Sequence, residues 1–515
     1  MGTLDAYTEE LLDELCERGG GAGPAEDLRA QYARACESDS PAVIAGFFEA
    51  LLAARRTAGT GAAAIGVTRE DLAALCARHE RCDEHGVTVG GRVGRARAIA
   101  ARASERVAEY LRTHASEAPS GLELWDRIRE NHDRIRRVLG ISADEWSTFT
   151  GQLGHAIGDV ETLARCVPLP PDALRDVARV TRSCRMRLTP YYAGLIMADR
   201  PDDPVLLQSV PTGEMVDNAG EEIPPVASDH SPARLIDQFY PRVVAVKVTN
   251  VCAMYCTHCL RIAHIGSRDR TFPTEAYEEA LAYIRAHAAI RDVLITGGDA
   301  FLLSNRTIRW FLSELDKIEH VTMKRLGTRV PVTTPQRIDA ELLDILEESN
   351  ERSPLRVVTQ INTAQEITPV SKEAFKRIAR RVSAVLNQAV LLRHVNDTRT
   401  KMWKLCETIQ AAYVRPYYIF NCSHRNPQFA HMRVPVEVGR DIVESMYGNI
   451  SGDAIPRYIA AAGGKVPLHR DNVVRFGKGE VTLRRPWNGE EVVYPDADPA
   501  VYGHDEGFGF RKYTW

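Results

Sequence analysis

The chain has 515 residues, enough for two or three domains of ordinary size. Hydrophobic residues make up 44% and charged residues 26%, as in a globular protein, and the formal net charge of −4 indicates neither a nucleic-acid partner nor an anionic membrane partner. No run of about 18 apolar residues predicts a transmembrane helix, and the first residues lack the pattern of a signal peptide, so we expect a cytoplasmic protein.

Residues 1–118 are rich in Ala, Arg and Glu and predict a helical N-terminal domain. Apolar residues recur there at helical spacing in three stretches, 26–36, 41–56 and 93–114. Residues 119–239 begin as further helices, but proline and acidic residues become frequent between residues 201 and 232. This composition predicts an extended arm rather than a packed element.

Between residues 240 and 430, apolar β-branched runs alternate with amphipathic helical stretches. The predicted strands are 243–248, 293–296, 321–326, 356–359, 384–392 and 414–420. The predicted helices are 275–287, 305–318, 339–348, 372–381 and 400–412. This alternation predicts an α/β fold with a parallel sheet, open or curled into a partial barrel, that binds ligands at the carboxyl ends of its strands. Residues 431–515 are less regular and form a C-terminal segment in this prediction.

The 11 cysteines are scattered over the chain, and this odd number does not indicate a secreted disulfide framework. Three of them, Cys252, Cys256 and Cys259, follow the first predicted strand with the spacing C-x3-C-x2-C. Three thiolates at this spacing can bind three irons of one [4Fe–4S] cluster. The fourth iron is then open to the amino and carboxylate groups of S-adenosylmethionine (SAM), as in radical SAM enzymes. Such an enzyme also needs an external electron donor.

The same run of cysteines has two other interpretations. A zinc site would normally use four ligands, and His258 could be the fourth. A simple electron-transfer protein would need a fourth cysteine and would not need six strand–helix units. The spacing and the position directly after a strand favour the cluster.

The cysteine run and several other motifs resemble the lysine 2,3-aminomutase family of radical SAM enzymes that depend on pyridoxal 5′-phosphate (PLP). The resemblance extends from about residue 122 to about residue 494 and includes residues 188–192, 252–261, 292–303, 327–337, 387–393, 415–422 and 463–465. It implies a partial (β/α)6 barrel with an N-terminal helical extension and a C-terminal segment that carries the PLP lysine. It also implies a homodimer with an amino acid as substrate.

The resemblance assigns five residues to SAM. Gly297, Gly298 and Asp299 follow the second predicted strand and match the segment that contacts the amino group of SAM; without the family, they would suggest a plain strand–helix turn. Gln388 matches a residue near SAM, although a buried amide bonded to backbone would look the same in the sequence. Tyr255, inside the cysteine run, matches a residue near the adenine.

The resemblance also assigns residues to PLP and to the substrate. Lys465 matches the lysine that binds PLP covalently, and the two glycines before it predict a mobile loop. Arg242 and Arg329 lie near predicted strand ends and are candidates for binding the PLP phosphate. Arg261 matches the arginine that binds the substrate carboxylate, for which a guanidinium is well shaped.

The chain departs from the lysine-specific members where they hold the distal ammonium with two aspartates. Here Ser423 and His424 stand at one position and alanines 460–462 at the other. Because a buried ammonium without an anion is costly, we expect a substrate other than lysine, with arginine and glutamate as candidates. Ser423 and His424 are then candidate substrate ligands. Thr398 replaces a zinc-binding cysteine of some members, so we expect no structural zinc.

The resulting prediction is an isomerase that moves the α-amino group of an L-amino acid to Cβ. One alternative keeps the same cofactors but oxidises or desaturates the amino acid. A second alternative is a non-catalytic iron–sulfur protein that does not bind PLP.

Overall fold

The computed structural model describes residues 6–16, 25–38, 40–80, 91–220, 230–266, 268–270 and 272–498. The chain divides into two compact units, Met1–Glu109 and Tyr110–Trp515. Among the described residues, no helix has the length and apolar character needed to cross a membrane.

The first unit is built from helices, as its composition predicts. They are α1 (Ala6–Cys16), α2 (Ala25–Glu37), α3 (Pro41–Ala58), α4 (Arg69–Glu80) and the first part of α5 (Gly91–Glu117). Leu12, Phe47, Phe48 and Leu72 are fully buried or nearly so and belong to one apolar cluster. The helices of this unit therefore bury a core of their own.

A single large sheet dominates the second unit and contains nine strands among the described residues. In spatial as in chain order they are β1 (Ile236–Tyr240), β2 (Val243–Thr249), β3 (Asp292–Gly297), β4 (Met323–Gly327), β5 (Leu355–Thr359), β6 (Ala384–Leu391), β7 (Arg415–Asn421), β8 (Arg457–Ala461) and β9 (Lys465–Pro467). Strands β2 to β8 run parallel, whereas β1 and β9 are antiparallel edge strands. The six predicted strands correspond to β2–β7. The prediction did not include β1, β8 and β9.

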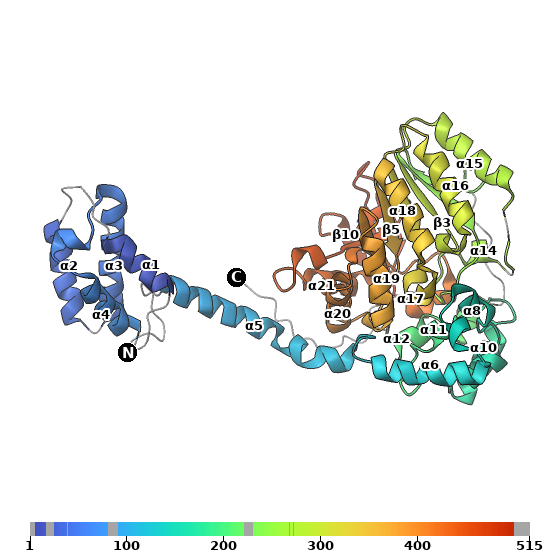
Figure 1. Ribbon diagram of the computed structural model, residues 1–515, viewed down its shortest axis with the longest axis horizontal. Coiled ribbons are helices and arrows are strands. Elements are labelled where there is room, and N and C mark those ends of the chain that lie inside the picture. The colour runs from blue at the N-terminus through green and yellow to red at the C-terminus, as the bar shows by residue number, and fades with distance from the viewer. Residues whose placement is uncertain are drawn as a thin grey trace. The chain divides into compact units, whose positions relative to one another are not determined.

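The sheet curls until its two edges meet. The backbone N–H of Lys465 on β9 donates a hydrogen bond of 2.6 Å to the hydroxyl of Tyr240 on β1. Helices cover the outer face of the sheet: α15 (Thr274–Ala286), α16 (Asn305–Asp316), α18 (Ala340–Arg352), α19 (Pro369–Ala379) and α20 (Arg399–Gln410) (Figure 1). The structure thus confirms the predicted partial barrel.

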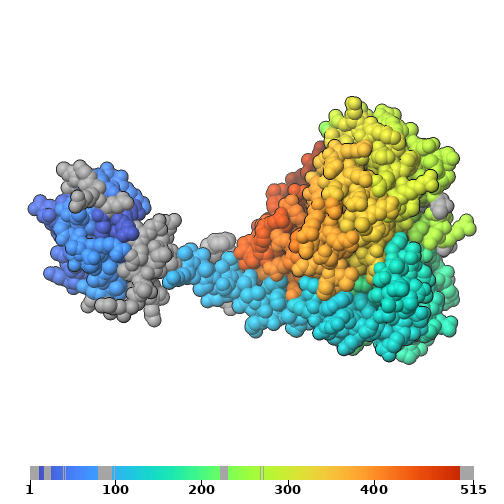
Figure 2. Space-filling model, viewed as in Figure 1, coloured from blue at the N-terminus to red at the C-terminus, as the bar shows by residue number. Residues whose placement is uncertain are grey.

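A group of helices, most of them short, precedes the barrel in the second unit. They are α6 (Trp125–Leu139), α7 (Ala143–Trp146), α8 (Phe149–Gly154), α9 (Val160–Cys166), α10 (Pro171–Val180), α11 (Pro190–Ala193), α12 (Pro204–Leu207) and α13 (Glu214–Ala219). Figure 2 shows this region in cyan along the lower edge of the unit, below the yellow and orange helices between residues 305 and 410.

The prediction of an extended arm from residue 201 is wrong for residues 201–220. Val205 and Met215 are buried there, and Pro204 stands in the first turn of α12. The side chain of Asp203 caps that helix by accepting from two backbone N–H groups. Proline here starts a short helix instead of breaking the fold, because its fixed φ suits the first helical position. Residues 221–229 of the predicted arm lie outside the described residues.

The C-terminal segment is more regular than its sequence suggested. Helix α21 (Val436–Glu444) precedes β8, and the hairpin β8–β9 extends the barrel sheet. A separate three-stranded antiparallel sheet follows, formed by β10 (Val473–Gly477), β11 (Glu480–Arg484) and β12 (Glu491–Pro495).

Candidate active site in the barrel

The three cysteines of the motif lie in one loop that leaves the carboxyl end of β2. Residues from the helices and turns that precede the barrel hold this loop in place through hydrogen bonds. The backbone N–H of Tyr255 donates to the carbonyl of Arg187 (3.2 Å), and that of Thr257 donates to the carbonyl of Gln208 (3.1 Å). The guanidinium of Arg187 donates to the carbonyl of Cys252 at 3.2 Å. The loop is therefore fixed at its beginning and at its centre.

The three thiols are free and lie within electrostatic range of one another. Burial raises the pKa of the Cys252 thiol well above its usual value, and the charges of Asp299, Cys259 and Cys256 add to the rise. Burial and Cys256 likewise raise the pKa of Cys259 to about 12. Among the described residues, no three His, Cys, Asp or Glu side chains converge on one metal ion. In a cubane cluster, each of the three thiolates would bind a different iron and the fourth iron would have no thiolate. The three cysteines therefore fit a [4Fe–4S] cluster.

His258, the possible fourth zinc ligand, is directed elsewhere. Its Nε2 lies 3.2 Å from Nδ2 of Asn362. Burial and the charge of Arg329 lower the pKa of His258 to about 3, so the ring is neutral. His258 therefore forms part of the packing beneath the loop.

The glycines after β3 serve a close approach between two backbone segments. Gly298 and Asp299 donate their N–H groups to the carbonyls of Thr249 and Val251, at 2.5 and 2.8 Å. A Cβ on Gly297 or Gly298 would overlap these same carbonyls, and Gly297 also has φ +124°. Glycine is thus required here because the start of the cysteine loop approaches these positions closely. The contact of this segment with SAM stays a prediction.

The other two predicted SAM residues differ in how fully their polar groups are paired. The hydroxyl of Tyr255 donates to Asp269 at 3.0 Å, and the guanidinium of Arg185 covers the ring at 4.5 Å. Gln388 lies on β6 opposite Tyr418, and its Nε2 is buried without a partner among the described residues. An orphaned buried amide on the inner face of a barrel is the kind of group that a bound ligand satisfies.

The predicted substrate residues occupy the carboxyl ends of two strands. One guanidinium nitrogen of Arg261 donates to the hydroxyl of Thr296 on β3 at 3.0 Å. Ser423 follows β7, is buried, and accepts from the backbone N–H of Arg425 at 3.2 Å. The ring of His424 packs edge-on against Tyr494 of β12, with centroids 4.9 Å apart. The structure therefore turns His424 towards the small C-terminal sheet.

Lys465 is the first residue of β9, and so it does not lie in the mobile loop that the preceding glycines suggested. It pairs with Ala461 across a tight turn that contains Gly463 and Gly464, with φ of +74° and +149°. Its ammonium lies over the rings of Tyr418 and Phe420, 4.9 and 5.9 Å from their centroids. The side chain is thus held against aromatic residues of β7.

The Lys465 amine forms no hydrogen bond or ion pair with any residue that the structure describes. Burial, and to a lesser degree the charge of Arg325, lower its pKa from 10.5 to about 8. Arg325 itself lies on β4 and pairs with Asp292 on β3 at 2.8 Å. A desolvated lysine with a lowered pKa is the usual form of an amine that attacks a carbonyl.

The two arginines proposed for the PLP phosphate lie at different ends of the barrel. Arg242 lies in the exposed turn after β1, two residues beyond Tyr240, which bonds to Lys465. Arg329 instead donates to the sulfur of Cys256 at 2.9 Å and to Glu366 at 2.7 Å. Since these bonds hold Arg329 at the cysteine loop, its assignment to the phosphate is corrected.

Sequence reasoning missed the residues that surround the cysteine loop and the Lys465 side chain. Around the cysteine loop these are Tyr192, Gln208 and Glu366, and around Lys465 they are Tyr240, Asp292 and Arg325. One signal was available for Arg325, because a charged residue inside an apolar strand run indicates a special partner. The others come from segments far apart in the chain, and no local pattern brings them together.

This chain is similar to known proteins over most of its length. Residues 246–400 match the model of the radical SAM superfamily. Glutamate 2,3-aminomutase of Clostridioides difficile is 36% identical over 406 residues, which are 78% of this chain and 94% of that protein. L-lysine 2,3-aminomutase of Clostridium subterminale is 35% identical over 72% of this chain and 88% of its own length. That of Bacillus subtilis is 33% identical over 73% and 79%.

Proposed function

The chain belongs to the 2,3-aminomutase family of radical SAM enzymes, and from this premise we propose that it is a PLP-dependent 2,3-aminomutase for an L-amino acid other than lysine. The observation that carries the PLP assignment is the amine of Lys465. It is half-buried against the aromatic rings of Tyr418 and Phe420 and has no acidic partner among the described residues. Such an amine suits a covalent bond to an aldehyde cofactor.

Different residues of the barrel suit the different cofactors. Cys252, Cys256 and Cys259 would hold the cluster, and Gln388 has an unpaired amide for SAM. Lys465 would hold PLP, and Arg242 lies close enough along the chain to Tyr240 to be proposed for its phosphate. When bound, the cluster with SAM supplies a carbon radical that removes a hydrogen atom, and PLP carries the amino group.

The protein's own contribution is binding and exclusion of water. Arg261 would bind the α-carboxylate, because among the described residues only one of its guanidinium nitrogens forms a hydrogen bond, with the Thr296 hydroxyl. With a pKa of about 8, Lys465 has an appreciable neutral fraction near pH 7, so it can act as a nucleophile and later accept a proton at Nζ. The curled sheet and its covering helices keep water from a reactive radical.

We propose that the distal group of the substrate is not an ammonium. Ser423 and His424 follow β7, where the lysine-specific members carry a carboxylate, and the alanines at 460–462 lie on and beside β8. Neither position supplies a negative charge, so a buried lysine side chain would be unpaired. Glutamate and arginine are the first substrates to assay, and one relative is named a glutamate 2,3-aminomutase.

The test is a panel of amino acids incubated anaerobically with the reconstituted, reduced enzyme and SAM, with mass detection of products. We expect a β-amino isomer of one non-lysine substrate while SAM is not consumed. A product lighter by two hydrogens, with one SAM consumed per turnover, would replace the mutase by a desaturase.

The PLP assignment is tested separately by absorption spectroscopy. We expect Lys465→Ala to lose the absorption band of covalently bound PLP. Lys478→Ala, which changes an exposed lysine in the same C-terminal segment, should keep it. A wild-type protein without any PLP band would favour the non-catalytic alternative.

A further inference from the structure

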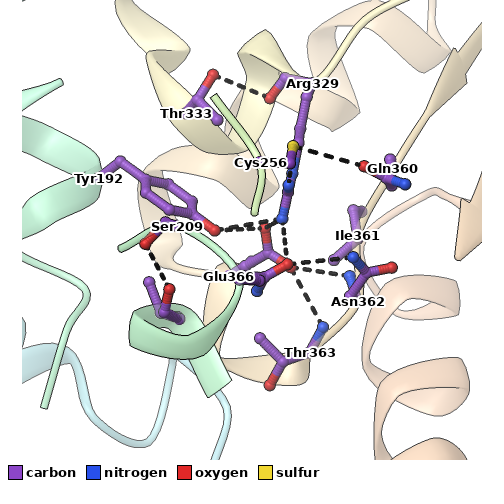
Figure 3. Close-up of polar contacts among 12 residues, drawn as sticks. Tyr192, Ser209, Cys256, Arg329, Thr333, Gln360, Ile361, Asn362, Thr363 and Glu366 are labelled. Carbon is purple, nitrogen blue, oxygen red and sulfur yellow. Dashed lines mark hydrogen bonds and ion pairs between the residues drawn. The ribbon is translucent and has the colours of Figure 1, made fainter. Parts of the chain in front are cut away.

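Arg329 is a buried cation whose guanidinium reaches the sulfur of a cluster cysteine. Its side chain follows β4 and is only 8% exposed. Nη1 donates to Sγ of Cys256 at 2.9 Å, as Figure 3 shows. A guanidinium donates strong, charge-assisted hydrogen bonds, so this contact places positive charge beside one ligand of the cluster.

The other end of the guanidinium is fixed by an acidic side chain. Nη2 donates to Oε1 of Glu366 at 2.7 Å and to the hydroxyl of Tyr192 at 3.3 Å, and it also bonds to Gln208. Glu366 is fully buried, and its Oε1 accepts a further hydrogen bond of 3.0 Å from Tyr192. Arg329 therefore cannot turn away from Cys256 without breaking several bonds.

Glu366 is held in turn by the backbone after β5. Its Oε2 accepts from the N–H groups of Asn362 and Thr363 at 2.8 and 3.2 Å. Gln208 accepts from Asn362 as well, at 3.1 Å. The network thus connects the helical region with the loops after β4 and β5, and its donors and acceptors converge beneath the cysteine loop (Figure 3).

Stability alone does not explain this arrangement. Burial of an arginine and a glutamate costs solvation free energy that an ion pair often fails to recover. An apolar cluster of the same volume would pack the loop equally well. The feature that an apolar cluster could not supply is a positive charge directed at sulfur.

We propose that Arg329 tunes the reduction potential of the cluster through its hydrogen bond to Cys256. Reduction adds one electron, from an external one-electron donor, to the oxidised cluster and takes its charge from 2+ to 1+. Hydrogen bonds to the sulfurs and nearby positive charge favour the reduced form and raise the potential. Arg329 is thus a positioning residue, whereas Glu366 fixes it and offsets part of its charge.

The inference rests on the cluster that the radical SAM family implies and is independent of PLP and of the amino acid substrate. Its failure would leave the proposed function intact. Conversely, a desaturase outcome or a missing PLP band would not affect it.

The experiment is a potentiometric titration of the reconstituted full-length protein, followed by electron paramagnetic resonance of the reduced cluster. At the potential where half of the wild-type cluster is reduced, we expect the ratio of reduced to oxidised cluster in Arg329→Met to be about tenfold lower. For one electron, this is a shift of about −59 mV. Arg329→Lys keeps the charge but loses the fork, so it should fall between the two.

The matched control is Arg337→Met. Arg337 is 3% exposed and donates to the carbonyl of Phe301 at 2.8 Å, but among the described residues it forms no hydrogen bond with a cysteine, so its loss should leave the potential unchanged. Glu366→Gln removes the counter-charge and should raise the potential, which keeps the test decisive if Arg329→Met does not fold. An unchanged potential in Arg329→Lys and Arg329→Met, or a fall in Glu366→Gln, would overturn the proposal.

Discussion

Two regions of the barrel, the cysteine loop and strand β9, each hold a cation, and the two cations are in opposite states. At the cysteine loop, both terminal nitrogens of Arg329 have partners, among them the buried carboxylate of Glu366. On β9, the Lys465 amine has no ionic or hydrogen-bond partner among the described residues and lies against aromatic rings. One cation is therefore held in its charged form, and the other is driven towards its neutral form. Paired charge suits a role in positioning, and unpaired charge suits reactivity.

The largest expected effect comes from removing the partner of Arg329. Glu366→Ala leaves a buried guanidinium without its counter-charge, which should lower the free energy of unfolding by about 3–5 kcal/mol. Urea unfolding followed by circular dichroism measures this change. Glu348→Ala, which removes an exposed ion pair with Arg309, should cost less than about 1 kcal/mol. Equal losses in the two variants would mean that the Arg329 network is no stronger than a surface pair.

A second test concerns the close contact between the glycines after β3 and the cysteine loop. Gly298→Ala adds a Cβ that would overlap the carbonyl of Val251 and should cost about 1–3 kcal/mol. Gly154→Ala, where the added Cβ meets no atom within 4 Å, is the control in the same thermal-unfolding series. A tolerated Gly298→Ala would show that the loop can shift away from β3.

Because of Lys465, the free energy of unfolding of the cofactor-free protein should depend on pH. The folded chain lowers the pKa of this amine from 10.5 to about 8, so between these pH values the unfolded chain binds more protons. Stability therefore rises as pH increases from about 8 to about 10.5. Lys465→Met should be more stable than wild type at pH 7, by about 1–2 kcal/mol, and this advantage should shrink by pH 10. A constant difference from pH 7 to pH 10 would contradict the lowered pKa.

The smallest effect concerns closure of the barrel. Tyr240→Phe removes the acceptor for the backbone N–H of Lys465 and should cost about 1 kcal/mol. Hydrogen exchange of the Lys465 amide should become faster, whereas Tyr447→Phe, at a residue 66% exposed, should change neither quantity. Unaltered exchange in Tyr240→Phe would show that β1 and β9 are held together by other contacts.

Much of the barrel was predictable because its signals are local. The runs at 243–248 and 384–392 correspond closely to β2 and β6, since buried parallel strands are continuous apolar segments. The short edge strands β1 and β9 were missed, because three to five residues with polar neighbours give no clear period. The segment from residue 201 was misjudged because proline starts a helix as readily as it interrupts one.

The sequence by itself determined the three cysteines after a strand and the lysine after two glycines, because each depends on residue types at fixed short spacing. Only the tertiary structure decided which side chains meet. Arg329 and Glu366 are 37 residues apart, and Tyr240 and Lys465 are 225 apart, yet each pair is in contact. Such pairs depend on the curl of the sheet and on the packing of the helical region, which arise from the whole chain. The difference between the paired cation of Arg329 and the unpaired cation of Lys465 therefore became visible only in the folded molecule.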